Sequence, residues 1–508
     1  MVSDLLHDND ACYQALRTRD ARFDGRFFVG VTSTRIYCRP VCRVRPPRQE
    51  NCRFFSLAAQ AEQAGFRPCL RCRPELAPAD RHWSSHDAGD RLIGHALQWL
   101  DDPANGLADS EGQSPLIRLS DHLGVTDRHL RRLFTHHLGM TPLQYLQTRR
   151  LLTAKLMLTD TSLPIGQVAL ISGFGSLRRF NDVFLQTYGL SPSRWRQPLQ
   201  VVPTAQPGMR PARLAWRPPM NVEATMDFLS RRQLRGNEAL IAGPQPGLLK
   251  AVELNHGGAR HTGWLRVRFS PAELCVLLDV SASLLPLLPQ VIWRVRHWLD
   301  LDTDTSPIDT VLDADFPEGR GIRVPGSFDG FELAVRAILG QQVSLDTANA
   351  LAERLTAELG EAVATPDASV TRLFPGPKRL AGILPSTLGE LGIVRQRQAA
   401  IISLAQACDG DGLRLDPVVD PSVIVRRLLD LPGIGPWTAQ YVAMRALRWP
   451  DAWPPGDAAL RRALVGRGRD KGLADLDATG ERWRPWRSYA AVRAWASLTP
   501  HPSPKDRP

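Results

Sequence analysis

The segment from Leu431 to Asp457 restricts the fold of this chain more than any other. It reads LPGIGPWTAQY, continues with mostly helical character, and ends in PPGDAAL. Gly433 and Gly435 carry no side chain, so a turn built on them lets the backbone approach a ligand closely. The next helix turns its first N–H groups outward, an arrangement suited to phosphate. The pattern predicts a helical hairpin that grips a DNA backbone beside one carboxylate, Asp457; an ordinary pair of packed helices is the alternative.

Composition and charge favour a multidomain, nucleic-acid-binding protein. The 508 residues correspond to roughly three or four domains. A net charge of +11 and a pI near 9.6 favour a nucleic-acid partner. The sequence has no apolar run long enough for a membrane span and no apolar signal region at its N-terminus. We therefore expect a bacterial cytoplasmic, nucleoid-associated protein with no membrane partner.

Four cysteines form two close pairs, Cys38-x3-Cys42 and Cys69-x2-Cys72. Two such pairs can meet as a tetrahedron of thiolates, so the spacing predicts one zinc ion. The site could be a structural staple alone, or one sulfur could remain nucleophilic. Arginines crowd around the quartet, and we expect three of them to contact DNA phosphates: Arg39, Arg43 and Arg45.

The quartet also carries a family resemblance. RIYCRPVCRVR and GFRPCLRCRP resemble the N-terminal domain of the Ada adaptive-response proteins. The resemblance implies that Cys38 accepts a methyl group from a DNA methyl phosphotriester, once per protein molecule. It implies that Cys42, Cys69 and Cys72 complete the zinc site. Methylation would change the formal charge of the site from −2 to −1, which would reduce repulsion from DNA.

An internal repeat with an offset of 50 residues follows. LRRLFTHHLGMTP (130–142) matches FNDVFLQTYGLSP (180–192), and each copy follows a short helix and a turn. Each copy reads as a helix-turn-helix unit with its recognition helix beginning near Thr126 or Ser176. The segment resembles the AraC-type transcription-factor domain, which implies promoter DNA and RNA polymerase as partners. The expected DNA-contacting side chains are Arg128, Arg131, Arg178 and Arg179.

The C-terminal part begins with strand-like runs, HTGWLRVRFS and ELCVLLDVS, and then becomes helical. RAILGQQVS, LPGIGPWTAQY, PPGDAAL and WRPWRSYAAVRAW resemble the AlkA family of alkylbase DNA glycosylases, within the helix-hairpin-helix superfamily. The resemblance implies that Asp457 is catalytic and that Trp437, Tyr441 and Trp495 form the base pocket. A flipped N-alkylated purine would stack on these rings, and Asp457 would stabilise the oxocarbenium-like sugar.

Two departures from relatives refine this expectation. Bifunctional relatives carry a lysine at the position of Trp437, so we expect a monofunctional enzyme without Schiff-base chemistry. No cysteine follows Cys408, which excludes the iron–sulfur cluster of some relatives, and no organic cofactor is expected. Gln342 stands where the family places the residue that wedges into the vacated base stack.

The expected fold is multidomain α+β. A small four-cysteine zinc domain is followed by an all-α paired helix-turn-helix domain, a mixed β/α subdomain and an α-helical glycosylase body. The expected divisions are a zinc methyl-acceptor domain (1–80), a paired helix-turn-helix domain (84–200), a linker (201–211), a β/α subdomain (212–300) and a helix-hairpin-helix glycosylase domain (301–500). We expect a monomer that excises 3-methyladenine- and 7-methylguanine-type bases from alkylated duplex DNA and also regulates transcription. Two alternatives remain: a methyl-sensing activator with an inactive glycosylase half, and a repair enzyme whose N-terminal half only binds DNA.

Overall fold

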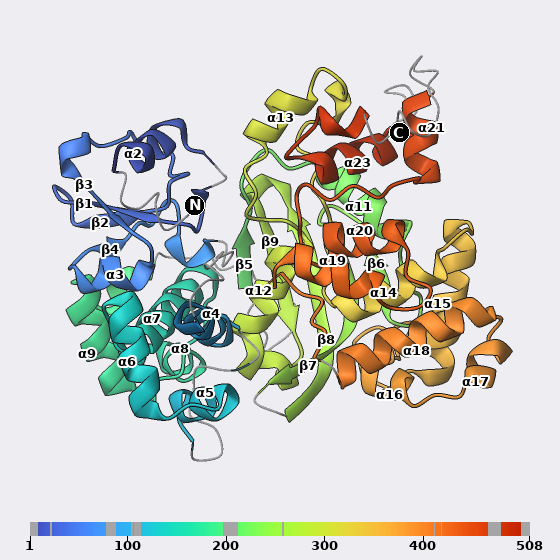
Figure 1. Cartoon of the computed structure of the whole chain (residues 1–508), viewed down its shortest axis with the longest axis horizontal. Helices are drawn as coiled ribbons and strands as arrows, with labels where there is room; N and C mark the ends of the chain where they lie inside the picture. Colours follow the sequence, from blue (N-terminus) through green and yellow to red (C-terminus); the bar gives the residue numbers. More distant parts are fainter. Residues whose placement is uncertain are drawn as a thin grey trace. The chain divides into compact units, whose positions relative to one another are not determined.

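The chain folds into two compact units, seen in the computed structural model of Figure 1. The first consists chiefly of Met1–Arg210, and the second chiefly of Pro211–Glu253, His261–Leu285 and Val291–Pro508. The structure describes residues 9–20, 23–77, 88–102, 105, 113–196, 212–256, 259–410, 412–417, 419–465 and 479–498. The expected linker, 201–211, lies outside the described residues. The observed mixture of a small sheet, paired helical units, a second sheet and a helical body confirms the multidomain α+β expectation.

The first unit begins with a four-stranded sheet of order β3-β1-β2-β4. Its strands are β1 Phe28–Val31, β2 Ile36–Cys38, β3 Cys52–Phe55 and β4 Arg67–Pro68, with helices α2 Asn9–Thr18 and α3 Ala58–Gln63. Strand β1 is antiparallel to β2 and β3, whereas β2 is parallel to β4. Parallel pairing of β2 and β4 sets the ends of these strands side by side. Cys38 ends β2 and Cys69 follows β4, so the sheet brings the two cysteine pairs together.

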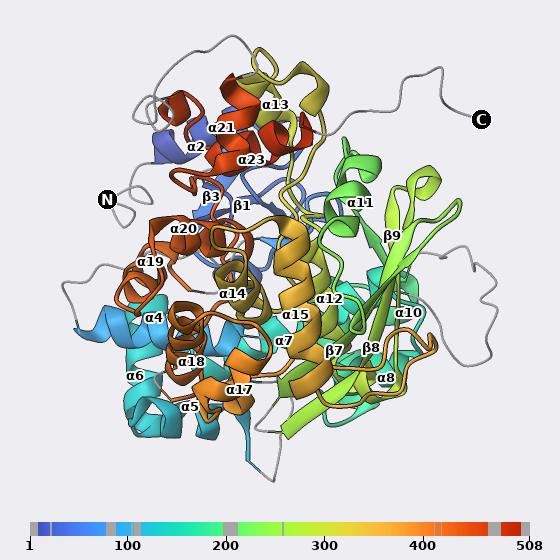
Figure 2. The ribbon, with the colours of Figure 1, turned by 90° about the vertical axis from the view of Figure 1, so that its right-hand side faces the viewer.

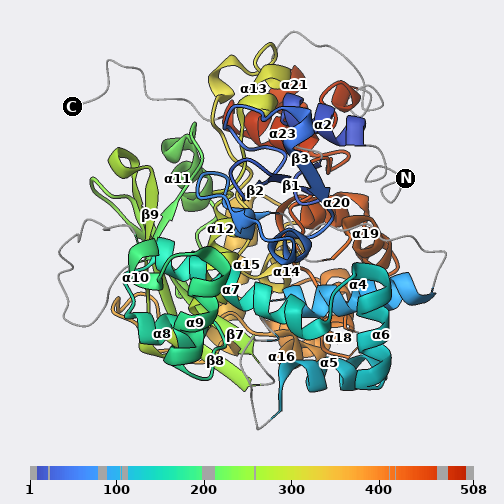
Figure 3. The same cartoon turned by 90° about the vertical axis from the view of Figure 1, so that its left-hand side faces the viewer.

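The described residues from 88 to 196 lie chiefly in helices (Figure 3). The helices are α4 Ala88–Asp101, α5 Pro115–Leu123, α6 Asp127–Leu138, α7 Pro142–Asp160, α8 Ile165–Ile171, α9 Leu177–Tyr188 and α10 Pro192–Trp195. Helices α6 and α9 have the predicted starts, because the Thr126 and Ser176 side chains accept from the backbone N–H three residues on. Gly139 and Gly189 end them in the left-handed conformation.

The repeat at an offset of 50 residues is thus a repeat of structure. Phe134 and Phe184 occupy equivalent places in α6 and α9, and both are fully buried. Pro142 and Pro192 each begin the next helix, where the missing N–H costs no hydrogen bond. Each copy therefore has a hydroxyl side chain that caps the start of its helix, a buried phenylalanine in its core and a glycine that ends the helix.

The second unit opens with a five-stranded sheet of order β5-β9-β8-β7-β6. The strands are β5 Ala212–Ala215, β6 Glu238–Ile241, β7 Gly247–His256, β8 Ala259–Ser270 and β9 Cys275–Val280, accompanied by α11 Val222–Ser230 and α12 Leu288–Trp298. The two predicted strand-like runs form β8 and β9. These strands are antiparallel, with Leu265 opposite Val280 at one end of the pairing and Ser270 opposite Cys275 at the other. All six residues of β9 are buried, as expected for a strand covered on both faces.

A helical body completes this unit (Figure 2). Its helices are α13 Ser306–Leu312, α14 Gly330–Leu339, α15 Leu345–Leu359, α16 Pro377–Ala381, α17 Pro385–Glu390, α18 Arg395–Asp409, α19 Pro421–Leu429, α20 Pro436–Arg445, α21 Ala458–Val465 and α23 Arg487–Ala496. The predicted break in the long helical run is real: α14 ends at Gly340 and α15 begins after Ser344. One apolar core joins these helices, and the hairpin residue Ile434 belongs to it.

Candidate functional site

A cleft of about 1660 Å³ opens in the second unit. It is lined by residues of α11, α14, α15, α20, α21 and α23, so segments far apart in the sequence meet there. The cleft contains Asp457, the three predicted aromatic residues, Gly433, Gly435 and Gln342. The structure thus brings together every residue that the sequence assigned to the C-terminal site.

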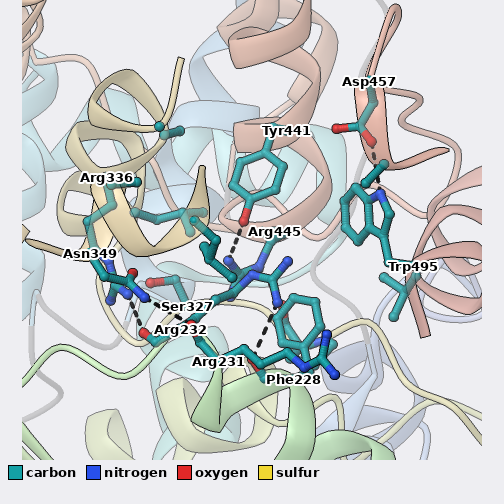
Figure 4. Close-up of a pocket in the computed structure, with 18 of the residues that line it drawn as sticks. Phe228, Arg231, Arg232, Ser327, Arg336, Asn349, Tyr441, Arg445, Asp457 and Trp495 are labelled. Carbon is teal, nitrogen blue, oxygen red and sulfur yellow. Dashed lines mark hydrogen bonds between the residues drawn. The ribbon is translucent and has the colours of Figure 1, made fainter. Parts of the chain in front are cut away.

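Asp457 immediately precedes α21 and is held by three N–H groups. Trp437 Nε1 donates to Oδ2 at 2.8 Å, and Trp495 Nε1 donates to Oδ1 at 3.0 Å. The backbone N–H of Leu460 also donates to Oδ1, at 2.7 Å, in the manner of a helix cap. Because both oxygens are bound, the carboxylate has a fixed place in the cleft (Figure 4).

The three predicted aromatics form one wall rather than a three-sided box. The rings of Trp437 and Tyr441 stack on each other, with centroids 5.1 Å apart and planes 13° from parallel. Trp495 lies 6.2 Å from Tyr441, tilted by 48°. A base therefore cannot enter between Trp437 and Tyr441 without separating the two rings.

The hairpin turn between α19 and α20 also lies at the cleft. Gly433 has φ +78°, and a Cβ there would lie 2.9 Å from the Cβ of Ala400. This residue is glycine because of both backbone conformation and packing. Gly435 differs: it is exposed, and a Cβ there would meet no atom within 4 Å. Its bare backbone faces open space at the start of α20.

Gln342 follows the end of α14 and is exposed at the cleft. Its φ is +56°, a left-handed backbone conformation that few residues other than glycine and asparagine adopt readily. Gln341 anchors the turn, since its Nε2 donates to Gly433 O at 2.9 Å and to Thr438 Oγ1 at 3.0 Å. The strained turn thus projects Gln342 while Gln341 ties it to the hairpin.

Lys250 is the one lysine among the described residues that line the cleft. Its Nζ donates to Asn237 Oδ1 and Glu238 Oε1 at 2.8 Å each, and to Glu332 Oε1 at 3.0 Å. Burial alone lowers the pKa of Lys250, but Glu238 and Glu332 outweigh it and raise the pKa. This amine is therefore a protonated structural group, not a free nucleophile.

The positive charge of this cleft was not predicted from the sequence. Arg232, Arg336 and Arg445 line it, together with the ring of Phe228 (Figure 4). They come from three separate helical regions, so no sequence motif joins them. The only available signal was the recurrence of arginine within segments already assigned to helices.

The cysteine quartet forms the second candidate site. The four Sγ atoms of Cys38, Cys42, Cys69 and Cys72 all lie within 4.8 Å of one another. Zinc bound tetrahedrally at about 2.3 Å from each thiolate needs such a cluster. Burial does not single out a reactive sulfur, because the four residues are between 3% and 6% exposed.

The arginines around the quartet differ in their surroundings. Arg39 is 2% exposed, pairs with Asp24 and donates through Nη1 to Cys72 O at 3.3 Å. Its guanidinium therefore supports the cysteine loop, contrary to the expectation of a DNA-contacting group, and its backbone N–H donates to Cys72 Sγ at 3.3 Å. Arg43 and Arg45 are exposed, and their expected contacts with DNA stay a prediction.

The predicted arginines of the helix-turn-helix units are also exposed. They lie in the first two turns of α6 and α9: Arg128, Arg131, Arg178 and Arg179. Arg131 pairs with Asp127 at 2.8 Å on the same helix, an exposed pair that a phosphate could displace.

A buried polar network joins the cysteine quartet to the helix-turn-helix segment. Arg73, next to the ligand Cys72, binds Asp160 at 2.6 Å and Glu75 at 2.9 Å. Lys155 of α7 also pairs with Glu75 and is 1% exposed. Breaking such a network would leave charges buried without partners. The zinc segment and the helices are therefore joined by buried ion pairs within the first unit.

None of the described helices has the length and apolarity needed to cross a membrane.

Comparison with known families divides the chain into four consecutive matches. Residues 11–75 match the metal binding domain of Ada, and residues 119–198 match a helix-turn-helix domain. Residues 211–329 match the AlkA N-terminal domain, and residues 335–479 match the HhH-GPD superfamily of base excision DNA repair proteins. The first match contains the quartet, which is accordingly a zinc site.

Curated relatives show the same composite organisation. A Mycobacterium tuberculosis protein described as a probable bifunctional transcriptional activator/DNA repair enzyme AlkA is 36% identical over 98% of each chain. DNA-3-methyladenine glycosylase 2 of Escherichia coli is 31% identical over 56% of this chain and 95% of its own. Bifunctional transcriptional activator/DNA repair enzyme Ada of Escherichia coli is 38% identical over 28% of this chain and 36% of its own. Since the first relative matches from end to end, this chain belongs to the AlkA-type family of bifunctional transcriptional activators and DNA repair enzymes.

Proposed function

We propose that the second unit is a monofunctional DNA glycosylase that hydrolyses the N-glycosidic bond of alkylated purines, with 3-methyladenine and 7-methylguanine as its type substrates. The observation that carries this proposal is Asp457, held by two indole N–H groups in a cleft beside the hairpin glycines. An alkylated purine is too deep in a duplex to reach this carboxylate. The damaged nucleotide must therefore leave the stack and enter the cleft.

Asp457 is the proposed catalytic group. As the bond between the base and C1′ lengthens, positive charge develops on the sugar, and a fixed carboxylate stabilises it without reorganising. Trp437, Tyr441 and Trp495 supply the aromatic wall for the base. Water then adds to C1′, which leaves a free base and an abasic site.

Positioning of the DNA is assigned to the hairpin and to Gln342. The backbone N–H groups at Gly433 and Gly435 suit a phosphate next to the flipped nucleotide. Gln342 would fill the space that the base leaves. The engaged Lys250 supports the absence of strand cleavage, since the one cleft lysine of the described residues has no free amine for a Schiff base.

Base release tests this half of the proposal. We expect the full chain to release 3-methyladenine from alkylated duplex DNA, and Asp457→Asn to lower the single-turnover rate by roughly a hundredfold or more. Borohydride should trap no covalent DNA adduct with either protein. Equal release by both proteins would mean that Asp457 is not the catalytic residue, and no release by either would leave this half inactive.

The first unit is proposed to be a methyl sensor and regulator. Cys38 Sγ would form a bond to the methyl carbon of a phosphotriester while the carbon–oxygen bond breaks, and the phosphodiester oxygen keeps the electron pair. One bound zinc would keep the quartet as thiolates at neutral pH. Arg43, Arg45 and the arginines of α6 and α9 would contact DNA, and RNA polymerase would be recruited to the promoter by a monomer.

Methyl transfer supplies the second test. Cys38→Ser should abolish transfer of radiolabelled methyl from alkylated DNA, with a limit of one methyl per wild-type chain, and should leave base release nearly intact. Cys408→Ser is the matched control, because this thiol lies outside the quartet. Methyl transfer from DNA to the Cys38→Ser protein would mean that another cysteine is the acceptor. Loss of base release in Cys38→Ser would contradict the expectation that the two units act independently.

A further inference from the structure

Hydrogen bonds join the two turns that face DNA in the proposed mechanism. One is the wedge turn, residues 340–344 between α14 and α15, which carries Gln342. The other is the hairpin turn with Gly433 and Gly435. Gln341 of the wedge turn and Gly433 are 92 residues apart in the sequence. Tertiary contacts must therefore hold these turns together if both are to act on one nucleotide.

Gln341 makes this connection. Its Nε2 donates to the backbone carbonyl of Gly433 at 2.9 Å and to Thr438 Oγ1 at 3.0 Å. A carbonyl oxygen can only accept, so the amide must turn its nitrogen toward the hairpin. Thr438 lies in the first turn of α20 and is 2% exposed. Two bonds, one to the hairpin turn and one to the helix that follows it, therefore fix Gln341.

Helix α18 is the third member of this arrangement. Arg397 of α18 donates through Nη2 to the backbone carbonyl of Gln341. The hairpin turn packs on the same helix, because a Cβ at Gly433 would lie 2.9 Å from the Cβ of Ala400 and 3.3 Å from Gln396 O. The wedge turn, the hairpin turn and α18 thus each contact the other two.

The conformation of the wedge turn makes these bonds necessary. Gln342 has φ +56°, a backbone conformation that is unfavourable for a residue with a Cβ. Gln342 is also exposed, so burial of its side chain does not offset this strain. On the far side of the turn, Ser344 caps α15 by accepting from the Thr347 N–H at 3.2 Å. We expect the turn to relax, and Gln342 to lose its place, when the bonds of Gln341 are lost.

Extrusion of a nucleotide from the duplex requires both turns. Unpairing and unstacking cost free energy, so a side chain that fills the vacated space favours the extruded state. A side chain whose distance from the phosphate contact is already fixed loses less conformational freedom on insertion. Building on the proposed glycosylase function, we propose that Gln341 is a positioning residue for extrusion. It couples the phosphate contact of the hairpin to the insertion of Gln342 and takes no part in bond cleavage at C1′.

The test separates extrusion from bond cleavage. Duplex oligonucleotides carry one N7-methylguanine opposite either cytosine or a tetrahydrofuran residue. The second lesion has no pairing partner, so its extrusion costs less. Gln341→Leu removes the two donors at similar volume. It should lower the maximal single-turnover rate roughly tenfold opposite cytosine and less than about twofold opposite tetrahydrofuran. The half-saturating protein concentration should change little, because the phosphate contact itself remains.

Three further variants distinguish this role from others. Asp457→Asn affects bond cleavage and should lower the maximal rate on both duplexes alike. Thr438→Val removes one acceptor and leaves the wedge turn unchanged, so it should give a smaller loss confined to the lesion opposite cytosine. It also provides the test if Gln341→Leu does not fold. Gln406→Leu is the matched control, because Gln406 is exposed on α18 and does not line the cleft. It should behave as wild type on both duplexes.

A double variant shows whether Gln341 acts through Gln342. In the Gln342→Ala background, Gln341→Leu should cost less than about twofold more opposite cytosine, since the side chain that it positions is absent. A full additional loss there would overturn the coupling. Equal losses on both duplexes from Gln341→Leu, or no loss on either, would also overturn it, and each of these results would leave the glycosylase function standing. Release from neither duplex by wild type would refute the proposed function itself, and the inference with it.

Discussion

At the scale of single residues, the hydrogen bonds to Asp457 matter more than its exposure. A carboxylate that must face a developing sugar cation loses effect if it can rotate away. The two indole N–H groups prevent this, one on each oxygen. In the proposed mechanism, Trp437 and Trp495 are therefore positioning residues as well as parts of the aromatic wall.

Trp437→Phe tests this double role. Phenylalanine keeps a ring against Tyr441 but removes the N–H that binds Oδ2. We expect single-turnover base release to fall by roughly tenfold to a hundredfold, since a hydrogen bond to a charged group contributes about 1.5–3 kcal/mol. In the Asp457→Asn background the same change should cost almost nothing more. A full additional loss there would mean that Trp437 acts on the base alone.

Most single residues of the C-terminal site could be predicted because each lies in a local motif. Asp457, Trp437 and Gly433 belong to short segments whose spacing is visible in the sequence. Arg232 and Arg445 could not be found this way, because the distance between them depends on how α11 packs near α20. The burial of Arg39 was also hidden, since its partner Asp24 lies in a separate loop.

At the scale of elements, the helical hairpin uses its two glycines for different reasons. Gly433 is required by the fold, because it combines a positive φ with a close contact to α18. Gly435 has φ −94° and free space around it, so the fold would accept a side chain there. We infer that Gly435 is kept bare for the DNA backbone.

A pair of alanine variants distinguishes these reasons. Gly433→Ala should lower the free energy of unfolding by about 1–3 kcal/mol, from strained backbone and the contact with Ala400. Gly435→Ala should change it by less than about 0.5 kcal/mol yet weaken binding to abasic-site DNA. Chemical denaturation and fluorescence anisotropy measure the two quantities. Wild-type DNA affinity in Gly435→Ala would remove the hairpin from the DNA contact.

Element boundaries were predictable where capping chemistry marks them. Thr126 and Ser176 begin α6 and α9, and Gly139 and Gly189 end them, as the repeat implied. The order of strands in the second sheet was not predictable. It depends on contacts between strands far apart in the chain, which no local pattern encodes.

At the scale of the whole molecule, the N-terminal unit contains a titratable carboxyl group between its two parts. Glu62 of α3 accepts hydrogen bonds from Tyr37 at 3.0 Å and from Tyr188 of α9 at 3.4 Å, and its Oε2 is buried. Burial raises the pKa of Glu62 to about 7, against an ordinary value of 4.5. The folded unit therefore holds a proton that the unfolded chain releases.

Stability should then fall as the pH rises. Below pH 4.5 the carboxyl is protonated in both states; between 4.5 and 7 only the folded state keeps the proton, and its advantage is lost as the pH passes 7. Glu62→Gln cannot ionise and keeps an acceptor for the tyrosines. Relative to wild type it should gain on the order of 2 kcal/mol between pH 5 and pH 8. Thermal unfolding of both full-length proteins at the two pH values measures this change in stability. An equal stability difference between Glu62→Gln and wild type at both pH values would contradict the prediction.

The network of Arg73, Glu75, Lys155 and Asp160 has a consequence for how such genes can be recombined. A crossover placed between the cysteine quartet and α7 would inherit a buried lysine without its carboxylate, or the reverse. The Escherichia coli glycosylase, which aligns with 56% of this chain, is a protein in its own right. We therefore expect the zinc-binding segment and the paired helices to be exchanged between genes together, because a split between them would separate Lys155 from Glu75.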